Sequence, residues 1–305
     1  MNVLLTGASG YIGGELRAIL AQETGVNLRL LVRDRGRLKF GPESRVEVYE
    51  GSTFDEVSLR RALSGVDVAY YLIHSMAAKG DFEELDRRSA ANFLAACLDH
   101  KVRRIIYLGG LGRKETASRH LLSRIETGEI LSSRPGRIQT LWFRAGIIIG
   151  AGSASFEIIR HLIRKLPVMT TPRWVRSFTQ PIGISDVIRY LAAARDLGAT
   201  ENLVVDIGSE KMTFQEMLQR AAGVMGLRRW IIPVPVLSPR ISSLWLILFT
   251  SVDFKIVRAL IDGLRSETIV MNDNARKYFP QIVPIPYDAA VEIALKSEEE
   301  RARKS

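Results

Sequence analysis

Three glycines spaced three residues apart, directly behind a short apolar run, constrain the fold of this chain most. The run is Val3–Leu5, Gly7, Gly10 and Gly13 form the turn, and a helical pattern follows over Ile12–Leu20. Glycine allows a turn too tight for a Cβ, backbone contact with a pyrophosphate and close packing of helix on strand. The spacing is G-x-x-G-x-x-G rather than G-x-G-x-x-G. Because strand, turn and helix follow in the required order, the sequence predicts a dinucleotide site, with the first N–H groups of the helix facing the phosphates.

A basic residue stands at the end of the second apolar run, Leu28–Val32. Arg33 lies twenty residues past Gly13, where an acidic residue would bind the ribose 2′-hydroxyl of NAD and an arginine accommodates the 2′-phosphate of NADP. Its planar, permanently charged guanidinium suits a phosphate. A solvated basic loop is the alternative, and Asp34 keeps NAD(H) open. We expect NADP(H) to be the preferred cofactor.

Strand-like and helical segments alternate regularly through the first half of the chain. The strand-like segments are Val3–Leu5, Leu28–Val32, Val46–Tyr49, Val68–Ile73, Arg104–Leu108 and Gln139–Phe143. The helical patterns are Ile12–Gln22, Val57–Ser64, Phe82–His100 and Ala117–Ser133. This order predicts an α/β fold, a doubly wound parallel Rossmann sheet with helices on both faces. We expect residues 1–150 to form an NAD(P)-binding domain. Residues 151–305 would form a smaller, mostly helical substrate lobe, interleaved with the last Rossmann elements at about 180–210.

Ligands of doubly wound sheets bind beyond the carboxyl ends of the strands. The residues predicted to contact the cofactor there are Thr6, Gly7, Ser9, Gly10, Tyr11, Ile12, Arg33, Ser52, Thr53, Leu72, Ile73, His74, Gly109, Gly110, Arg144, Ala145 and Gly146. His74 follows an apolar strand and borders the ligand in this interpretation. A lone histidine is, however, more often held by hydrogen bonds within the protein.

The composition is that of an ordinary globular protein without a disulfide framework. Hydrophobic residues at 47% and charged residues at 25% are ordinary values, and 305 residues suffice for one large core or a core with a smaller lobe. The single cysteine, Cys97, lies in a helical pattern, which argues against a disulfide framework or a thiol metal site. We expect no metal. The first strand begins almost at the initiator methionine, so we expect no signal peptide and a cytoplasmic protein.

The formal net charge of +10 points to an anionic partner. Residues 158–185 contain no acidic residue, with Trp174 and Phe178 between the basic ones. The basic residues are Arg160, Arg164, Lys165, Arg173 and Arg176. A cleft rim for an anionic cofactor or substrate, or a membrane-facing surface, explains this segment. Nucleic acid is the least favoured partner, because no aromatic RNA-binding strand, zinc spacing or recognition helix accompanies it.

Taken together, the motifs are similar to those of the short-chain dehydrogenase/reductase superfamily, within it the atypical, NmrA-like or extended-like group. The segments that carry the resemblance are Thr6–Gly13 (T-G-A-[ST]-G-x-[IV]-G), Leu31–Arg33, Asp86–Ala96, Arg144–Gly150 (R-P-G-x-x-x-G) and Gln180–Val187 (Q-P-[IV]-x-x-x-D-V). The resemblance covers residues 1–210 well and the remainder loosely. It implies the Rossmann fold and an NAD(P) cofactor, and leaves the substrate open.

The departures from that superfamily concern the catalytic groups. Most active members carry a serine near the end of the fifth strand and a Tyr-x-x-x-Lys on the next helix. Here the strand ends in Gly109–Gly110, and the helix holds His120 and Arg124, which share one helix face. In one interpretation His120, with an ordinary pKa near 6.5, is the general acid and Arg124 holds cofactor or substrate. In the other, the pair contacts ribose, phosphate or solvent.

The adenine side also departs from the family pattern. Ser52 and Thr53 stand where members usually have Gly-Asp, whose carboxylate meets the adenine amine. Contact with adenine would therefore rely on a hydroxyl or on the backbone.

The second half of the chain is less regular. Its expected elements are helices at Ser185–Arg195 and Phe214–Val224, a strand at Leu203–Ile207 and a proline-interrupted extended stretch at Trp230–Leu237. Residues 241–252 carry no charge, but twelve residues are too few to span a bilayer. A buried helix is favoured. The alternatives are a substrate tunnel lining and an interfacial anchor with peripheral membrane contact. Trp245 and Phe249 would share one face of the expected helix. The tail, Lys296–Ser305, alternates in charge and is expected to fray.

Two functions of different classes follow. The first is an NADP(H)-dependent oxidoreductase that passes hydride to a carbonyl or activated double bond of an apolar substrate, held between the sheet and the lobe after Phe156. The second is a non-catalytic dinucleotide-binding protein, either a redox sensor like NmrA or a structural subunit resembling one of respiratory complex I. The missing Ser/Tyr/Lys set motivates the second. The sequence leaves the oligomeric state open.

Overall fold

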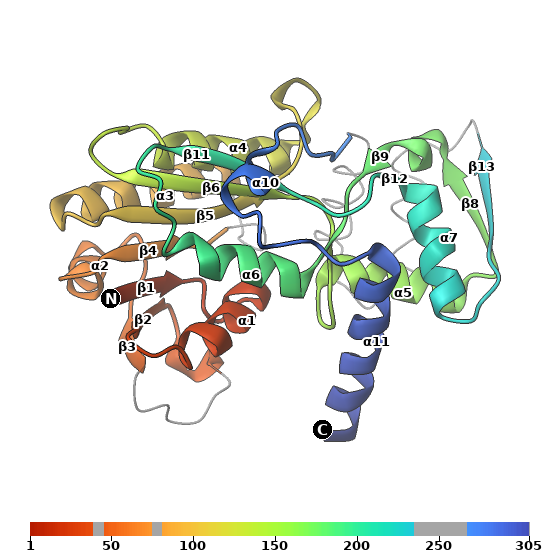
Figure 1. The fold of residues 1–305 in the computed structure, drawn as a ribbon, viewed down its shortest axis with the longest axis horizontal. Coiled ribbons are helices and arrows are strands. Elements are labelled where there is room, and N and C mark those ends of the chain that lie inside the picture. Colours follow the sequence, from red (N-terminus) through yellow and green to blue (C-terminus); the bar gives the residue numbers. More distant parts are fainter. Residues whose placement is uncertain (39–45, 75–80, 235–266, 305) are drawn as a thin grey trace.

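A seven-stranded parallel sheet forms the centre of the protein in a computed structural model that describes residues 1–38, 46–74, 81–234 and 267–304 (Figure 1). Its strand order is β11-β6-β5-β4-β1-β2-β3. The strands are β1 (Asn2–Thr6), β2 (Asn27–Val32), β3 (Val46–Glu50), β4 (Val68–Tyr71), β5 (Arg104–Gly110), β6 (Gln139–Ala145) and β11 (Leu203–Ile207). The order reverses between β1 and β4, which is the switch point where such sheets bind ligands. The predicted doubly wound Rossmann fold is confirmed.

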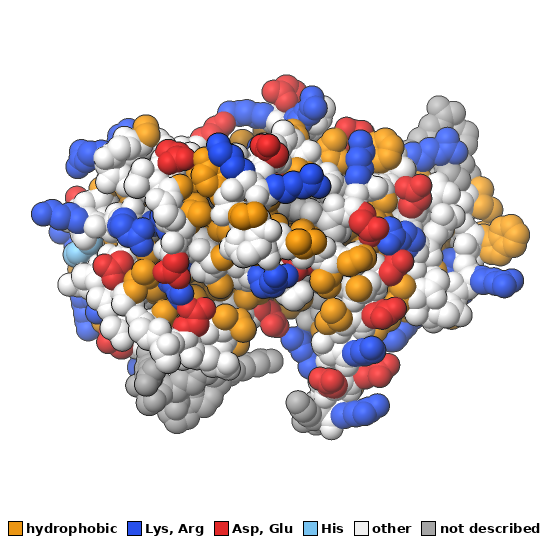
Figure 2. Space-filling model, in the orientation of Figure 1, with side chains coloured by type: hydrophobic (Ala, Val, Ile, Leu, Met, Phe, Trp, Pro, Cys, Tyr) orange, Lys and Arg blue, Asp and Glu red, His pale blue; other side chains and the backbone are white. Residues whose placement is uncertain are grey.

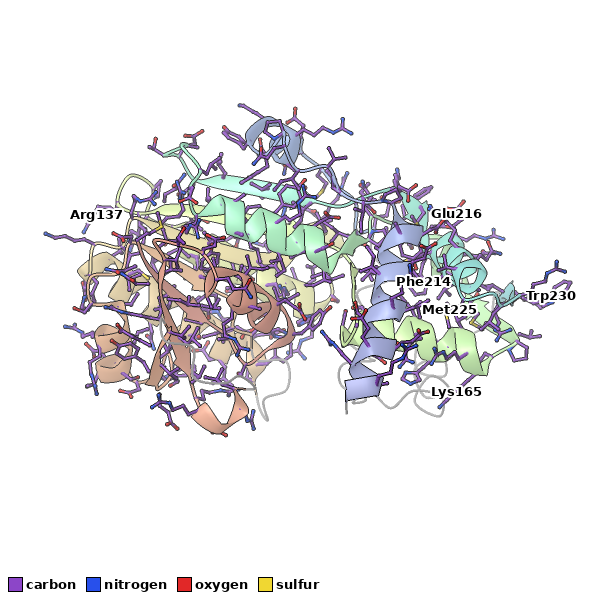
Figure 3. The ribbon with its side chains drawn as sticks, turned by 60° about the horizontal axis from the view of Figure 1, so that its bottom comes forward. Arg137, Lys165, Phe214, Glu216, Met225 and Trp230 are labelled. Carbon is purple, nitrogen blue, oxygen red and sulfur yellow. The ribbon has the colours of Figure 1, made fainter. Side chains whose placement is uncertain are left out.

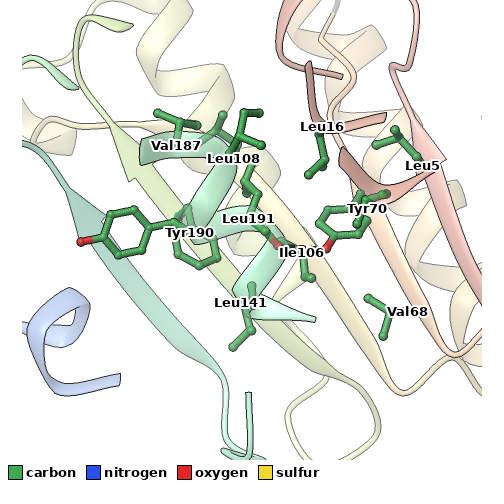
Figure 4. Packing of buried hydrophobic residues seen from close by; sticks show 14 of the residues in the cluster. Leu5, Leu16, Val68, Tyr70, Ile106, Leu108, Leu141, Val187, Tyr190 and Leu191 are labelled. Atoms are coloured by element: carbon green, nitrogen blue, oxygen red, sulfur yellow. Dashed lines mark hydrogen bonds between the residues drawn. The ribbon is translucent and has the colours of Figure 1, made fainter. Parts of the chain in front are cut away.

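Helices cover both faces of this sheet because side chains alternate along each strand. Val3 and Leu5 join the core under α1 (Tyr11–Leu20) and α6 (Ile184–Ala194). Leu4 joins the opposite core, under the remaining helices. Those are α2 (Glu56–Leu63), α3 (Phe82–Asp99) and α4 (Arg119–Leu131). Figure 4 shows the first core, where Tyr70 of β4 lies among aliphatic side chains from α1 and α6. Full burial of one such leucine contributes about 1.5–3 kcal/mol.

The second half forms a lobe with its own hydrophobic core, to the right in Figure 1. Its larger elements are α5 (Ala154–Lys165), β8 (Val168–Pro172), α7 (Phe214–Val224), β13 (Trp230–Val234) and α11 (Tyr287–Lys304). Shorter ones are β7 (Ile148–Ile149), β9 (Phe178–Thr179), β10 (Ile182–Gly183), β12 (Met212–Thr213) and α10 (Asn274–Tyr278). Single 3-10 turns in the described ranges are η1 (Arg35–Arg37), η2 (Lys114–Thr116) and η3 (Arg173–Arg176). After α5 the chain returns to the sheet as α6 and β11, so the two halves interleave.

The structure differs from the sequence-based expectations at several element ends. β5 continues through Gly109 and Gly110, and α4 begins after Ser118, whose hydroxyl accepts the Leu121 amide at 3.3 Å. The expectation of a frayed tail is wrong, because α11 remains helical to Lys304. Arg301 near its end donates hydrogen bonds to Glu15 and to the Ala151 carbonyl.

Two expectations concern residues that the structure does not describe, and two others concern membrane-spanning helices and metal sites. The apolar segment 241–252 and the side chain of Trp174 lie outside what the structure describes. Among the described helices, none is both long and apolar enough to cross a membrane. Within the same ranges, no three His, Cys, Asp or Glu side chains lie together as a metal site would require.

Candidate functional site at the carboxyl edge of the sheet

The glycine turn after β1 is too crowded for side chains. Gly7 has a φ of +74°, and a Cβ there would lie 2.3 Å from the Leu72 carbonyl oxygen. A Cβ at Gly13 would lie 2.2 Å from the Gly7 carbonyl oxygen. The Gly10 amide donates to that same carbonyl at 2.9 Å, which closes the turn. The turn therefore presents bare backbone at the switch point of the sheet.

The N-terminus of α1 opens toward this turn. Gly10 is its N-cap, and no side chain in the described part of the chain caps it. The backbone N–H groups at Tyr11 and Ile12 are thus available to an anion, and Ser9 beside them is exposed. The Tyr11 ring points elsewhere, because a Cβ at Gly150 would lie 2.2 Å from its hydroxyl oxygen. Burial raises the pKa of Tyr11, which contributes its backbone rather than its phenol to the predicted site.

Thr6 connects β1 to β4 from inside the sheet. Its buried hydroxyl donates to the Tyr70 carbonyl at 2.9 Å and accepts the Leu72 amide at 3.3 Å. Leu72 and Ile73 follow β4 and are half-buried. Thr6 therefore holds the segment that faces the glycine turn, and its hydroxyl is used within the sheet.

Arg33 is an unpartnered cation at the end of β2. Its side chain is exposed and makes no hydrogen bond or ion pair with any described residue. Asp34 beside it is engaged in its own turn, where it accepts the Gly36 amide at 2.8 Å and lies 3.6 Å from Arg37. The free charge next to the glycine turn is therefore positive.

The hydroxyl of Thr53 points into the protein. It shares a hydrogen bond of 2.7 Å with Ser89, which also bonds the Tyr71 hydroxyl at 2.7 Å. Asn92 donates to the Thr53 carbonyl at 3.0 Å. An adenine could therefore meet only Ser52 and the backbone at this point, although the sequence marked both hydroxyls as candidates.

The glycine pair that ends β5 lies against bulky neighbours. A Cβ at Gly109 would lie 2.5 Å from Nε1 of Trp142, and one at Gly110 would lie 2.8 Å from the Leu121 side chain. Gly128 of α4 makes room for the same indole ring. The space beside Gly109 is thus filled by Trp142 of β6. Sequence analysis missed this role of Trp142, because nothing local links it to residue 109.

Beyond these glycines lie two histidines and one arginine. The rings of His74 and His120 are 5.1 Å apart between centroids. Arg124 donates through Nη2 to the Leu108 carbonyl at 2.6 Å. Its buried Nε and the buried Nδ1 of His120 lack hydrogen-bond partners within the described ranges. Arg124 also has no carboxylate partner there.

The electrostatics of this group keep the imidazoles neutral. Burial, then the charge of Arg124, lowers the pKa of His120 to about 4. The same two causes, and His120 itself, lower the pKa of His74. His120 is half-buried, and the ring of His74 packs against it while part of His74 stays at the surface. The expectation that His120 keeps an ordinary pKa is therefore corrected, and at neutral pH the only charge in the group belongs to Arg124.

Arg144 is turned away from the predicted cofactor. Its guanidinium forms two bonds with the fully buried Asp206 of β11, Nε–Oδ1 at 2.6 Å and Nη2–Oδ2 at 3.0 Å. The expectation that the Arg144 side chain contacts the cofactor is corrected, because its guanidinium joins two strands instead. Ala145 accepts the Leu111 amide at 2.9 Å. A Cβ at Gly146 would lie 3.0 Å from the Gln180 carbonyl oxygen, so this glycine permits close backbone approach.

Comparison with known proteins agrees with this geometry. Residues 7–132 match a family described as NAD(P)H-binding. A search of curated protein sequences finds no match. A triphenylmethane reductase from Citrobacter sp. has a similar structure, with 20% identity and a TM-score of 0.77 over 97% of this chain and 100% of that one. The same enzyme complexed with NADP(H) gives 18% identity and a TM-score of 0.77, over 96% and 100%.

Two further solved structures extend the likeness. A nucleoside-diphosphate-sugar epimerase from Staphylococcus aureus is 16% identical, with a TM-score of 0.72 over 96% of this chain and 100% of that one. A short-chain dehydrogenase/reductase superfamily protein from Agrobacterium tumefaciens with bound NAD is 16% identical, with a TM-score of 0.71 over 100% and 99%. The likeness of these structures shows the fold, and residues 7–132 match the NAD(P)H-binding family.

Proposed function

We propose that this chain is an NADP(H)-dependent oxidoreductase of the atypical short-chain dehydrogenase/reductase group, which its Rossmann fold and the NAD(P)H-binding match of residues 7–132 support. Its acceptor would be a carbonyl or activated double bond of an apolar substrate. One observation carries the proposal: the free guanidinium of Arg33 stands beside the bare glycine turn, where a dinucleotide's 2′-phosphate needs a cation.

Different residues bind different parts of the cofactor. The backbone of Gly7–Ile12 and the N-terminus of α1 hold the pyrophosphate, Arg33 holds the 2′-phosphate, and Ser52 borders the adenine. NADPH, when bound, supplies the hydride. Residues 1–150 act as the cofactor domain, and the lobe within 151–305 encloses the substrate.

Arg124 and His120 provide the polar groups for hydride transfer. Hydride addition to a carbonyl leaves negative charge on oxygen, which a preorganised cation stabilises. Arg124 suits this role, because its Nε has no partner and no carboxylate in the described chain neutralises it. His120 acts as a neutral hydrogen-bond donor rather than as an imidazolium, and the proton that completes the alcohol comes from water. The triphenylmethane reductase among the structural neighbours supports an apolar acceptor.

Cofactor titration tests the first half of this proposal. NADPH and NADH are titrated against the wild type, Arg33→Ala and, as a distant control, Arg137→Ala. Arg33→Ala should cost NADPH about 1–3 kcal/mol of binding free energy, as expected for a charge-assisted bond, and leave NADH unchanged. Equal affinities of the wild type for the two dinucleotides would refute the phosphate argument.

Turnover tests the second half. NADPH oxidation is followed with a panel of apolar aldehydes, ketones and enones, using wild type, His120→Ala and Arg124→Lys. Both variants should lower kcat more than they raise KM, since their contacts strengthen in the transition state. If bound NADPH is never oxidised, the enzyme proposal fails.

One observation favours a second candidate, a non-catalytic dinucleotide-binding sensor or structural subunit. Trp142 occupies the space beside residue 109, so a serine in that place would force the indole to shift. A protein that binds the dinucleotide without catalysing a reaction would tolerate the loss of the catalytic serine. Tight NADPH binding without turnover, together with a conformational response to the redox state of the dinucleotide, would support this candidate.

A further inference from the structure

A two-stranded parallel ribbon, β8 with β13, forms the end of the lobe away from the sheet (Figure 1). Its side chains alternate between two faces. Ile231 and Met169 are 8% and 1% exposed and join the lobe core. Trp230 is 71% exposed and pairs with Val168, which is 49% exposed. The ribbon thus has a second apolar face, and this face meets solvent.

Ile232, two residues after Trp230, extends this outer face and is 46% exposed. Figure 2 shows hydrophobic side chains protruding at the end of the molecule where β13 lies, with blue side chains next to them. Trp230 stands at the outermost part of the lobe in Figure 3. Large apolar side chains grouped in this way are uncommon on a surface that meets only water.

Three cations lie on the segments that flank the apolar face. Arg164 and Lys165 end α5, and Arg228 precedes β13; all are exposed. No ion pair joins any of them to a described residue. Arg229 between them is used internally, since it donates to the carbonyls of Ile163 and Arg164 and fastens β13 to the end of α5.

No acidic residue offsets this charge nearby in sequence. Residues 158–185 and 217–234, which contain the ribbon and both flanks, include no Asp or Glu. We call the set Arg164, Lys165, Val168, Arg228, Trp230 and Ile232 the lobe tip. It combines an interfacial aromatic, two aliphatic side chains and three exposed positive charges, none of them in an ion pair with a described residue.

We propose that the lobe tip docks onto the surface of an anionic lipid bilayer. Tryptophan favours the boundary between headgroups and acyl chains, and unpaired lysine and arginine side chains are attracted to anionic lipids. Charge complementarity selects this occupant: an apolar protein partner would leave three cations without counter-charges, whereas a bilayer of anionic lipid satisfies the apolar and basic groups together. This inference does not depend on the enzyme proposal.

Vesicle co-sedimentation of the full chain tests the proposal. The probes are phosphatidylcholine vesicles with and without phosphatidylglycerol, at low and high salt. The wild type should bind the anionic vesicles, and high salt should weaken binding because it screens exposed charge. Absence of binding, or equal binding to neutral vesicles, would overturn the proposal.

Surface variants place the contact. Trp230→Ser should weaken binding at least about tenfold, because its apolar ring no longer enters the interface. Lys165→Gln with Arg228→Gln should weaken it about 25-fold, at about fivefold for each charge. The matched controls are Val283→Ser, 74% exposed, and Arg137→Gln, at the other end of the molecule in Figure 3.

The controls should bind like the wild type, and NADPH titration of every variant reports whether its fold is intact. If the lobe-tip variants bind vesicles as the wild type does, the tip is not the docking surface. If the wild type does not bind vesicles and Trp230→Ser instead dissociates a dimer, the lobe tip is covered by a second copy of this chain.

Discussion

At the scale of single residues, Gly109 shows how one side chain can exclude another. Trp142 occupies the volume that a Cβ at 109 would need. Gly109→Ser should therefore destabilise the protein by about 1–3 kcal/mol, as overpacking does, and should not create a catalytic serine. Urea unfolding measures the change. Gly198→Ser, where a Cβ meets no atom within 4 Å, is the matched control, and equal stability of both variants would show that the indole can move.

The lowered pKa of His120 predicts how stability depends on pH. Its pKa lies near 4 in the folded protein and near 6.5 when unfolded, so between these values the unfolded chain binds the extra proton. Stability is therefore lost as pH falls through this window. His120→Gln should reduce that loss, measured as the free energy of unfolding at pH 7 and pH 4.5. His100→Gln, on the far end of α3, controls for removal of a histidine; if both variants follow the wild type, His120 does not cause the acid sensitivity.

The limits of the sequence also appear at this scale. The glycine turn and the free Arg33 could be located from sequence, since turn, strand and helix signals are local. The inward hydroxyl of Thr53 could not, because its partner Ser89 lies 36 residues away. The partner of Arg144 is 62 residues away, on β11. Side-chain direction depends on which distant segments become neighbours.

At the scale of elements, helix α11 is fastened along its last turns. Arg301 donates to Glu15 of α1 at 2.9 Å and to the Ala151 carbonyl at 2.8 Å. One turn earlier, Arg160 of α5 lies 3.1 Å from Glu298. These bonds explain why the charged tail remains helical although its sequence alone predicts fraying. The alternating apolar runs, by contrast, correctly predicted the order of strands and helices because their period is set within each element.

Glu298 should make the stability of this helix fall as pH rises from acidic to neutral values. Burial, then its hydrogen bond with Glu157, raises the pKa of Glu298 from 4.5 to about 7. The folded protein thus binds the extra proton between these values, so stability is lost as pH rises through them. Glu298→Gln should keep more of its stability from pH 5 to pH 8 than the wild type, measured by thermal unfolding. Glu299→Gln is the neighbouring control, and parallel losses in all three proteins would exclude Glu298 as the cause.

At the scale of the whole molecule, cofactor binding should stabilise both halves together. A ligand at one hundred times its Kd adds about 2.7 kcal/mol to the free energy of unfolding. NADPH should therefore raise the unfolding midpoint of the sheet and of the lobe in one transition, since α6 and β11 follow the first lobe elements in the chain. Calorimetry with and without NADPH distinguishes this from two transitions of which only one shifts.

The late return of β11 also decides where this protein can be divided. A chain cut after residue 150 would contain the whole NAD(P)H-binding match, yet it would leave β6 as an open edge and Arg144 without its buried carboxylate. An open edge of this kind pairs readily with other chains, so the shortened protein should aggregate. The segment that carries the cofactor motif therefore cannot be separated from the rest of the chain. The strand that completes its sheet, β11, comes after the first elements of the lobe in the sequence.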